Sequence, residues 1–286
     1  MRVLLLGSDT PVGRSLQEFL LRRGRHVETL PLADCRWKSE RRTKKALVRA
    51  SCEFVVDTRL QAAADSGDKI FDLDLVRTQW LAKSCQKSKM AYLYLSTARV
   101  FSGIHERLYT EEDSPDNDEG IGKLLRRAEA SVAEHCDHHL ILRLGPVFSH
   151  RGVNVLTHMI NQFSEGGNLM LEDHLRGCPV AADDAARVAS GLLDQFSTGA
   201  DSWGIYHYCS SDATDCYQFS EVLLACASQF SEFSPHAVEL LRPEQEKEQL
   251  NRSLDCSLLR NTFAIKQNPW RGFVSEAVKR YFQSQK

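Results

Sequence analysis

The first thirteen residues, MRVLLLGSDTPVG (residues 1–13), decide the fold. The apolar run from Val3 to Leu6 is typical of a strand buried on both faces of a parallel sheet, and it ends at Gly7. Thr10 is a good helix N-cap, and Pro11 suits the first helical position because its nitrogen has no proton to satisfy. The stretch predicts a strand, a glycine-bearing loop and a helix N-terminus, a junction that binds pyrophosphate in dinucleotide-binding α/β domains.

The loop departs from the usual glycine pattern at its centre. Gly7 and Gly13 occupy the first and last positions of GxxGxxG, whereas Thr10 stands where the middle glycine lets the backbone approach the phosphates. We therefore expect a weakened cofactor site formed by Gly7, Thr10, Pro11, Val12 and Gly13. An ordinary strand-to-helix turn without a ligand is the alternative.

Composition limits the class of protein. The chain has 286 residues, of which 42% are hydrophobic, so it can bury a sizeable core in one large domain or two unequal ones. A net charge of -2 gives no general attraction to nucleic acid or to an anionic membrane, and neither is an expected partner. No stretch approaches the roughly 20 apolar residues of a membrane span, and no cleavage site follows the start, so we predict a cytoplasmic protein.

The cysteines and histidines do not suggest a metal site. Nine cysteines occur singly without a CxxC pair, as expected of reduced, buried thiols. His135, Cys136, His138 and His139 are close in sequence, but their side chains should diverge where a helix gives way to a strand.

Strand and helix patterns alternate through residues 1–146, which predicts a Rossmann-like, doubly wound parallel sheet that binds NAD(P) at the carboxyl ends of its strands. Residues 147–286 are predicted to form a smaller α/β substrate-binding lobe, whose segments can interleave with the first part. The strands expected in the first part are 3–6, 26–30, 53–56, 91–95 and 140–144, and the helices begin at residue 11 and cover 43–50, 70–85 and 120–136. In the second part we expect strands at 169–171 and 204–209, and helices at 153–163, 183–196, 219–230 and 273–282.

The second strand leads into a stretch with conflicting signals for the cofactor. Asp34 is acidic, and an acidic residue at this position favours the ribose hydroxyls of NAD. The arginines that follow favour the extra phosphate of NADP. A solvated helix face is the alternative for these charges. The basic residues are Arg36, Lys38, Arg41, Arg42, Lys44, Lys45 and Arg49.

LSTARVFSG (residues 95–103), with Tyr109 and Glu111, resembles the STDYVFDG…Y.E stretch of the dTDP-4-dehydrorhamnose reductases. The resemblance implies an extended short-chain dehydrogenase/reductase that reduces a sugar-nucleotide ketone with NADP or NAD as cofactor. It also extends to the regulatory beta subunit of methionine adenosyltransferase, which has this fold and would imply a protein partner. Further matching segments are LRLGPVF (142–148) with Gly152 and Asn154, GCPVAADDAA (177–186), GIYHYC (204–209), and RSLDCSLL (252–259) with Pro269 and Trp270.

The resemblance also assigns catalytic positions. In the family a Tyr donates a proton, a Lys four residues later lowers its pKa and holds the nicotinamide ribose, and a Ser or Thr orients the carbonyl. PDNDEGIGK (residues 115–123) matches the family pattern P.N.YG.SK, so Lys123 is the lysine, Thr97 the hydroxyl and Glu119 stands at the tyrosine position. Ser96 and Lys123 would lie beside the cofactor.

Other departures gather on the same face. Gly122 stands where Ser is usual, Ala98 and Arg99 replace the Asp and Tyr of STDYVF, and Asp57 and Asp74 replace asparagines. The catalytic motif is therefore degenerate.

The change at position 119 has a direct chemical consequence. A carboxyl group with a pKa near ~4.3 is ionised at neutral pH and has no proton to donate, unlike a phenol with a pKa near ~10. Lys123, one helical turn on, favours the ionised form, so we predict a Glu119–Lys123 ion pair that removes Lys123 from its usual task. A plain solvent-facing lysine is the alternative.

By resemblance, Tyr109, Asn154 and Arg176 would face a sugar nucleotide; ordinary loop roles are the alternative. The leading hypothesis is a catalytically impaired member that binds NAD(P) or another nucleotide and regulates a partner. The second hypothesis is an active NAD(P)H-dependent reductase that uses Thr97 and Lys123 with a substitute acid, such as Tyr109 or a water.

Overall fold

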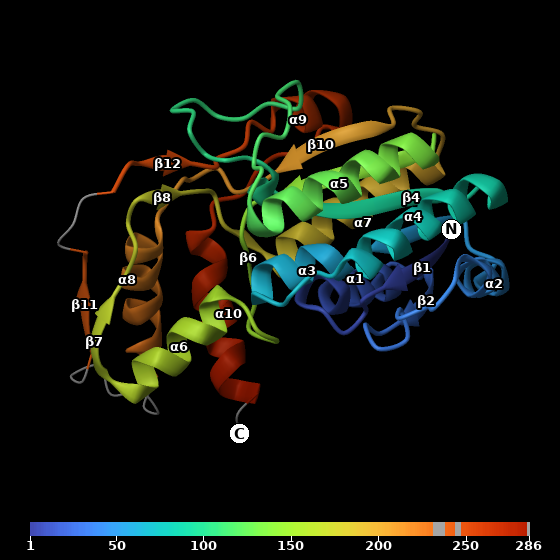
Figure 1. The fold of residues 1–286 in the computed structure, drawn as a ribbon. Coiled ribbons are helices and arrows are strands. Elements are labelled where there is room, and N and C mark those ends of the chain that lie inside the picture. The colour runs from blue at the N-terminus through green and yellow to red at the C-terminus, as the bar shows by residue number, and fades with distance from the viewer. Residues whose placement is uncertain (231–237, 244–246, 285–286) are drawn as a thin grey trace.

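The computed structural model describes residues 1–230, 238–243 and 247–284, and its centre is a six-stranded sheet of order β10-β5-β4-β3-β1-β2 (Figure 1). Every neighbouring pair in this sheet is parallel. The predicted doubly wound α/β fold is thus confirmed. The strands are β1 (Arg2–Leu6), β2 (His26–Leu30), β3 (Phe54–Asp57), β4 (Ala91–Thr97), β5 (His139–Leu144) and β10 (Gly204–Tyr208).

Helices cover both faces of this sheet. On one face α1 (Pro11–Arg22) packs against α7 (Ala182–Ser197). On the other, α4 packs between α2 and α5, and Figure 1 shows β4 lying between α5 and α7. The helices of that second face are α2 (Glu40–Ala50), α4 (Asp72–Ser88) and α5 (Gly120–His135), and α3 (Arg59–Ser66) follows β3.

The layers follow from the sequence pattern. Val3 to Leu6 are at most 1% exposed because β1 lies between β2 and β3 and is covered on both faces. Leu16 and Leu20 place the apolar side of α1 on the same core. A continuous apolar strand followed by an amphipathic helix can bury both surfaces only in this layered arrangement.

A smaller lobe has an apolar core of its own, with Trp270 and Phe163 among its buried side chains. Figure 1 shows α6, α8 and α10 beside the strands β7 and β11 at one end of the molecule. These elements are α6 (Val155–Glu165), β7 (Gly167–Met170), α8 (Cys216–Ala227), β11 (Val238–Leu241) and α10 (Arg271–Ser284). Short elements complete the chain: η1 (Ala98–Val100), β6 (Val147–Phe148), β8 (Leu175–Arg176), β9 (Val180–Ala181), β12 (Leu250–Asn251) and α9 (Ser257–Phe263).

Some elements differ from the sequence prediction. The strand β10 and the helix α7 belong to the large sheet unit, because β10 pairs with β5 and α7 packs on α1. We retain 1–146 and 147–286 as a proposed division, with β10 and α7 as the segments through which the two parts interleave. The helix α3 was not predicted, since its alanine-rich sequence lacks a distinct apolar stripe.

All nine cysteines are unpaired, and seven of them are buried. His135 contacts Ser131 O and His139 contacts Cys136 O, so the histidines of that segment face separate backbone partners. Among the described residues, no helix is both long and apolar enough to cross a bilayer.

Candidate functional site

The loop between β1 and α1 is held by the side chain of Thr10. Its hydroxyl donates to Gly7 O at 2.8 Å, lies 2.8 Å from Thr58 Oγ1, and accepts from the N–H of Gly13 at 3.0 Å. Thr10 is 3% exposed and caps α1, as predicted. The residue is therefore fixed in one position where the glycine loop motif has no side chain.

Both remaining glycines of the loop are required by its compactness. Gly7 has a φ of +77°, and a Cβ on it would lie 2.5 Å from Thr58 Oγ1. A Cβ on Gly13 would lie 2.1 Å from Gly7 O. The tight turn thus needs these glycines whether or not a ligand binds, so their presence does not by itself distinguish the two alternatives.

A cavity of about 460 Å³, the loop cavity, opens at the carboxyl ends of β1, β2 and β3. Arg36 lines this cavity, whereas Asp34 is exposed and is not part of its wall. The wall consists of Asp9, Thr10, Pro11, Leu32, Cys35, Arg36, Arg59, Leu60, Ala62, Ala63, Ser66, Asp68, Lys69, Ile70, Phe71, Asp74, Gly152 and Val153.

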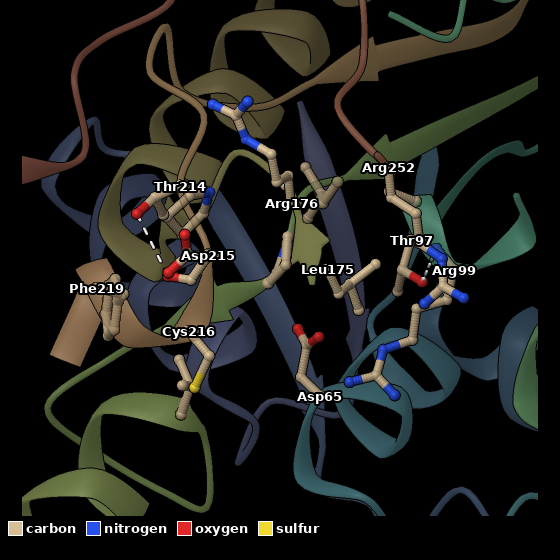
Figure 2. Close-up of a pocket in the computed structure, with 16 residues that line it drawn as sticks. Asp65, Thr97, Arg99, Leu175, Arg176, Thr214, Asp215, Cys216, Phe219 and Arg252 are labelled. Carbon is tan, nitrogen blue, oxygen red and sulfur yellow. Dashed lines mark hydrogen bonds between the residues drawn. The ribbon is translucent and has the colours of Figure 1, made fainter. Parts of the chain in front are cut away.

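A second cavity of about 300 Å³, the lobe cavity, lies between the ends of β4 and β5 and the smaller lobe (Figure 2). Thr97 and Arg176, two of the predicted site residues, line it. The helix α3 contributes to both cavities, with Asp65 on the lobe cavity and Ser66 on the loop cavity. The lining consists of Asp65, Thr97, Ala98, Arg99, Leu144, Pro146, Val155, Leu175, Arg176, Gly177, Pro179, Thr214, Asp215, Cys216, Phe219 and Arg252.

The two adjacent hydroxyls at the end of β4 differ in position. Thr97 reaches the lobe cavity, and its Oγ1 accepts from the N–H of Arg99 at 3.1 Å. Ser96 is fully buried, lines neither cavity, and its hydroxyl has no partner among the described residues. Of this pair, Thr97 is the one that can orient a bound carbonyl.

Glu119 and Lys123 lie apart from both cavities. Each is exposed at the start of α5, where the N–H of Lys123 donates to Glu119 O at 3.2 Å. The predicted ion pair between these two residues is wrong: the structure describes both and brings no charged atoms of the two within 4.0 Å. Exposed charges gain little from pairing in water, which explains why the lysine points to solvent.

Gly122 is explained by its neighbours. A Cβ at this position would lie 2.3 Å from Asn117 Nδ2 and 2.4 Å from Arg99 O. Asn117 Nδ2 donates to Arg99 O at 2.8 Å, so the two groups occupy the space that a serine side chain would need. The packing of the loop before α5 against the helix therefore requires glycine at this position.

Two further predicted site residues have internal partners. Tyr109 is 1% exposed, stacks on Phe101, and its hydroxyl accepts from the N–H of Gly103 at 3.0 Å. Asn154 is 2% exposed and caps α6, with its amide donating to Arg151 O at 3.0 Å. Neither lines a cavity, and both fit the alternative of ordinary structural residues.

The lobe cavity contains an acid that the sequence did not single out. Asp65 Oδ2 accepts from Gln61 Nε2 and from the N–H of Val147. Burial raises the pKa of Asp65 to about 7, although the charge of Arg99 acts to lower it. A carboxyl group with such a pKa exchanges its proton near neutral pH, which is the behaviour of acid–base groups in active sites.

A doubly wound parallel sheet, a glycine loop after β1 and a cavity closed by a smaller lobe define a Rossmann-like protein of the nucleotide-binding type. The chain belongs to the RmlD substrate binding domain family, whose sequence profile matches residues 1–283.

The similar proteins carry one recurring name. A dTDP-4-dehydrorhamnose reductase of Sinorhizobium fredii is 25% identical over 77% of this chain and 78% of its own length. Another, of Aggregatibacter actinomycetemcomitans, is 22% identical over 94% of this chain and 96% of its own. Among solved structures, a dTDP-4-dehydrorhamnose reductase of Clostridium acetobutylicum has a TM-score of 0.83 at 19% identity, covering 98% and 99% of the two chains. That of Bacillus anthracis, in complex with NADP, has a TM-score of 0.81 at 19% identity, covering 100% and 99%.

Proposed function

We propose that this protein binds NADP(H) and a sugar nucleotide in its two cavities, lacks the ordinary proton-donating chemistry of a reductase, and acts as a regulatory, binding member of its family. The position of α5 carries this proposal. Glu119 replaces the proton-donating tyrosine, and both it and Lys123 are exposed and line neither cavity. A carbonyl bound beside Thr97 would have an orienting hydroxyl without a phenol.

The residues around the loop cavity fit a dinucleotide. Thr10 and Pro11 place the N-terminus of α1 on the wall, where the helix dipole favours an anion. Arg36 adds a positive charge to the wall, while Asp34 is exposed outside it, and this difference favours NADP over NAD. The reductase of Bacillus anthracis, whose structure contains NADP, supports the same choice. A bound cofactor supplies hydride in active reductases.

Thr10 should make this binding weak. Its hydroxyl faces Gly7, Thr58 and Gly13, so the side chain cannot rotate away from the loop without losing its contacts. We therefore expect Kd values above roughly 10 μM for both cofactors.

The test is calorimetric titration of the full chain with NADPH and NADH. Arg36→Gln should remove the preference for NADPH, because the positive charge on the cavity wall is lost. Arg41→Gln makes the same charge change at an exposed position outside both cavities, and should leave the preference intact. Absence of binding by either cofactor, even at millimolar concentration, would overturn the cofactor part of the proposal.

The regulatory part concerns a protein partner and a compartment. The resemblance to the regulatory beta subunit of methionine adenosyltransferase motivates a partner, and we retain the cytoplasm as the predicted compartment. Purification of the full chain from its own cells at physiological salt should yield a stoichiometric complex. Recovery of the isolated chain alone, with turnover of a sugar nucleotide, would contradict the regulatory reading.

Asp65 favours a second candidate function, an active NAD(P)H-dependent reductase of a sugar-nucleotide ketone. It shares the lobe cavity with Thr97, and its raised pKa, about 7, leaves a proton available at neutral pH. It therefore replaces Tyr109, whose hydroxyl is engaged in the core, as the best substitute acid. In this case, Asp65→Asn should abolish ketone reduction and Lys123→Ala should affect it less, because Lys123 lines neither cavity.

A further inference from the structure

Two arginines from distant parts of the chain line the same wall of the lobe cavity. Arg99 belongs to η1, after β4, and Arg252 follows β12. Figure 2 shows them close to Thr97, on the side of the cavity opposite Thr214 and Asp215. The fold thus brings two positive charges and one hydroxyl together on one face of the cavity.

Neither arginine forms an ion pair among the described residues, although Asp116 acts on Arg252 and Asp65 on Arg99 at longer range. The Arg99 guanidinium makes no hydrogen bond or ion pair there, and Arg252 Nε donates only to Ser102 O, at 3.3 Å. In contrast, the buried Arg59 and Arg143 each lie 2.7 Å from a carboxylate oxygen. Partly buried guanidinium groups without a counter-charge are costly, so the free pair needs an explanation.

The two charges also repel each other. Burial, together with the charge of Arg99, lowers the pKa of Arg252. Asp65 offsets the pair only in part: the charge of Arg99 acts to lower its pKa, but no ion pair joins it to either arginine and it carries its proton for part of the neutral range. The cavity therefore has an excess of positive charge that an anion would relieve.

We propose that Arg99 and Arg252 bind an anionic oxygen group, a phosphate or a carboxylate, of the ligand in the lobe cavity. The guanidinium fork matches both groups, since each presents two coplanar acceptor oxygens. This inference rests on the proposed function for the identity of the ligand as a sugar nucleotide. The anion can be the diphosphate of that ligand or a carboxylate on its sugar.

Inorganic pyrophosphate is the first probe, because it requires no choice of base or sugar. Calorimetry on the full chain should detect binding that weakens at least about tenfold in Arg99→Gln, the loss of one charge-assisted contact. Arg99→Lys should retain part of the affinity. Arg260→Gln removes an exposed charge outside both cavities and is the matched control. Arg36→Gln removes a charge from the loop cavity and shows how much of the pyrophosphate binding belongs to that cavity.

Pyrophosphate binding that is equal in Arg99→Gln, Arg252→Gln and the unaltered protein, or no binding at all, overturns the inference. Circular dichroism and the melting temperature without ligand establish that each variant is folded. If one arginine variant does not fold, the other and Arg99→Lys decide the question.

Two sugar nucleotides, UDP-glucose and UDP-glucuronate, distinguish the sources of the anion. If the diphosphate is recognised, both bind alike and both weaken in Arg99→Gln. If a sugar carboxylate is recognised, UDP-glucuronate binds more tightly and only its advantage is lost in the variant. Binding of sugar nucleotides that is indifferent to both arginines rejects the inference and keeps the proposed function. If NADPH and sugar nucleotides do not bind but pyrophosphate binds in a way that depends on the arginines, the proposed function is rejected and the inference is kept.

Discussion

Asp57 and Arg59 form an ion pair of 2.7 Å at the wall of the loop cavity, with Asp57 fully buried and Arg59 6% exposed. Tyr92 also donates to Asp57 Oδ2 at 2.7 Å. Burial acts to lower the pKa of Arg59, but the Asp57 carboxylate raises it above the ordinary value. The negative charge at position 57, where the resemblance implies an asparagine, therefore has its counter-charge two residues on.

Asp74, the second asparagine replacement, is compensated in the same way. Its Oδ1 lies 2.7 Å from Arg77 Nη1, and its Oδ2 accepts from the N–H of Phe71 at the start of α4. Both aspartates thus have a local ion-pair partner, Arg59 and Arg77, within this chain's own structure. Departures from a family motif near a ligand site are in this case structural substitutions with identifiable partners.

The Asp57–Arg59 pair predicts a strong effect on stability. Asp57→Asn should lower the free energy of unfolding by about 3–5 kcal/mol, because it leaves the buried charge of Arg59 without a counter-charge. Urea denaturation at pH 7 measures the change. Asp74→Asn is the matched control, since its pair with Arg77 is more exposed and should cost no more than about 1 kcal/mol. The double variant Asp57→Asn/Arg59→Met should be more stable than Asp57→Asn alone. If Asp57→Asn is as stable as the unaltered protein, the prediction is wrong.

Thr10 allows stability and cofactor binding to be separated. Thr10→Val keeps the size of the side chain and loses its hydrogen bonds, so it should lower the free energy of unfolding by about 1–3 kcal/mol without tightening NADPH binding. Thr10→Gly loses the same bonds but opens the loop, and should tighten NADPH binding. Calorimetric titration and denaturation of both variants provide the comparison. If the Kd for NADPH falls in Thr10→Val, or does not fall in Thr10→Gly, the side chain does not obstruct the phosphates.

Asp65 predicts a pH dependence. Its pKa in the folded protein, about 7, is raised above the ordinary value of 3.8, so the folded state binds more protons than the unfolded state between these values. The stability contribution of this group is therefore present at low pH and lost as the pH rises through about 7. The melting temperature of Asp65→Asn, relative to the unaltered protein, should be higher at pH 8 than at pH 5.

Anion binding in the lobe cavity should change in the same direction. Ionisation of Asp65 adds a negative charge to the cavity, so Asp65→Asn should bind pyrophosphate more tightly than the unaltered protein at pH 8, and the difference should shrink at pH 6. Burial raises the pKa of Cys216, which keeps its proton in this range. The other charged groups on the cavity wall are Arg99, Arg176, Asp215 and Arg252. A pH profile that is unchanged in Asp65→Asn would contradict the assignment.

Sequence patterns predicted the features that depend on neighbouring residues. The strand β1, the cap by Thr10 and the start of α1 at Pro11 follow from short-range rules, and all are observed. The lobe cavity depends instead on pairing across the chain, which places Arg252 beside Arg99. No local pattern indicates that contact. Asp65 was missed because α3 itself was not predicted.

The ion pair predicted between Glu119 and Lys123 shows the limit of helical spacing. Residues four apart on a helix can meet, but Glu119 is the N-cap of α5 with an extended backbone, φ -119° and ψ 155°. Its side chain therefore does not lie on the helical face of Lys123. A spacing argument requires both residues to be inside the helix.

The catalytic prediction concerns the same position. A reductase must place a proton donor within hydrogen-bond reach of the developing alkoxide, and a positioned general acid contributes about 10² to 10⁴-fold in rate. The unaltered protein should reduce a sugar-nucleotide ketone with NADPH no faster than a blank, because Glu119 is exposed and lines neither cavity, away from a carbonyl bound beside Thr97. Glu119→Tyr restores the phenol one turn before Lys123, but at an exposed position outside both cavities, so any recovered turnover should be small and should appear first in this variant combined with Thr10→Gly. NADPH oxidation with product detection is the assay, and Glu119→Phe, which has the ring without the hydroxyl, is its control.

Two outcomes would contradict this prediction. If the unaltered protein turns over the substrate at ordinary enzymatic rates and loses this activity in Lys123→Ala, the family's reaction survives here with the lysine in its usual task, and the binding-protein proposal is wrong. Turnover that is lost in Asp65→Asn and kept in Lys123→Ala would assign the proton to the lobe cavity instead.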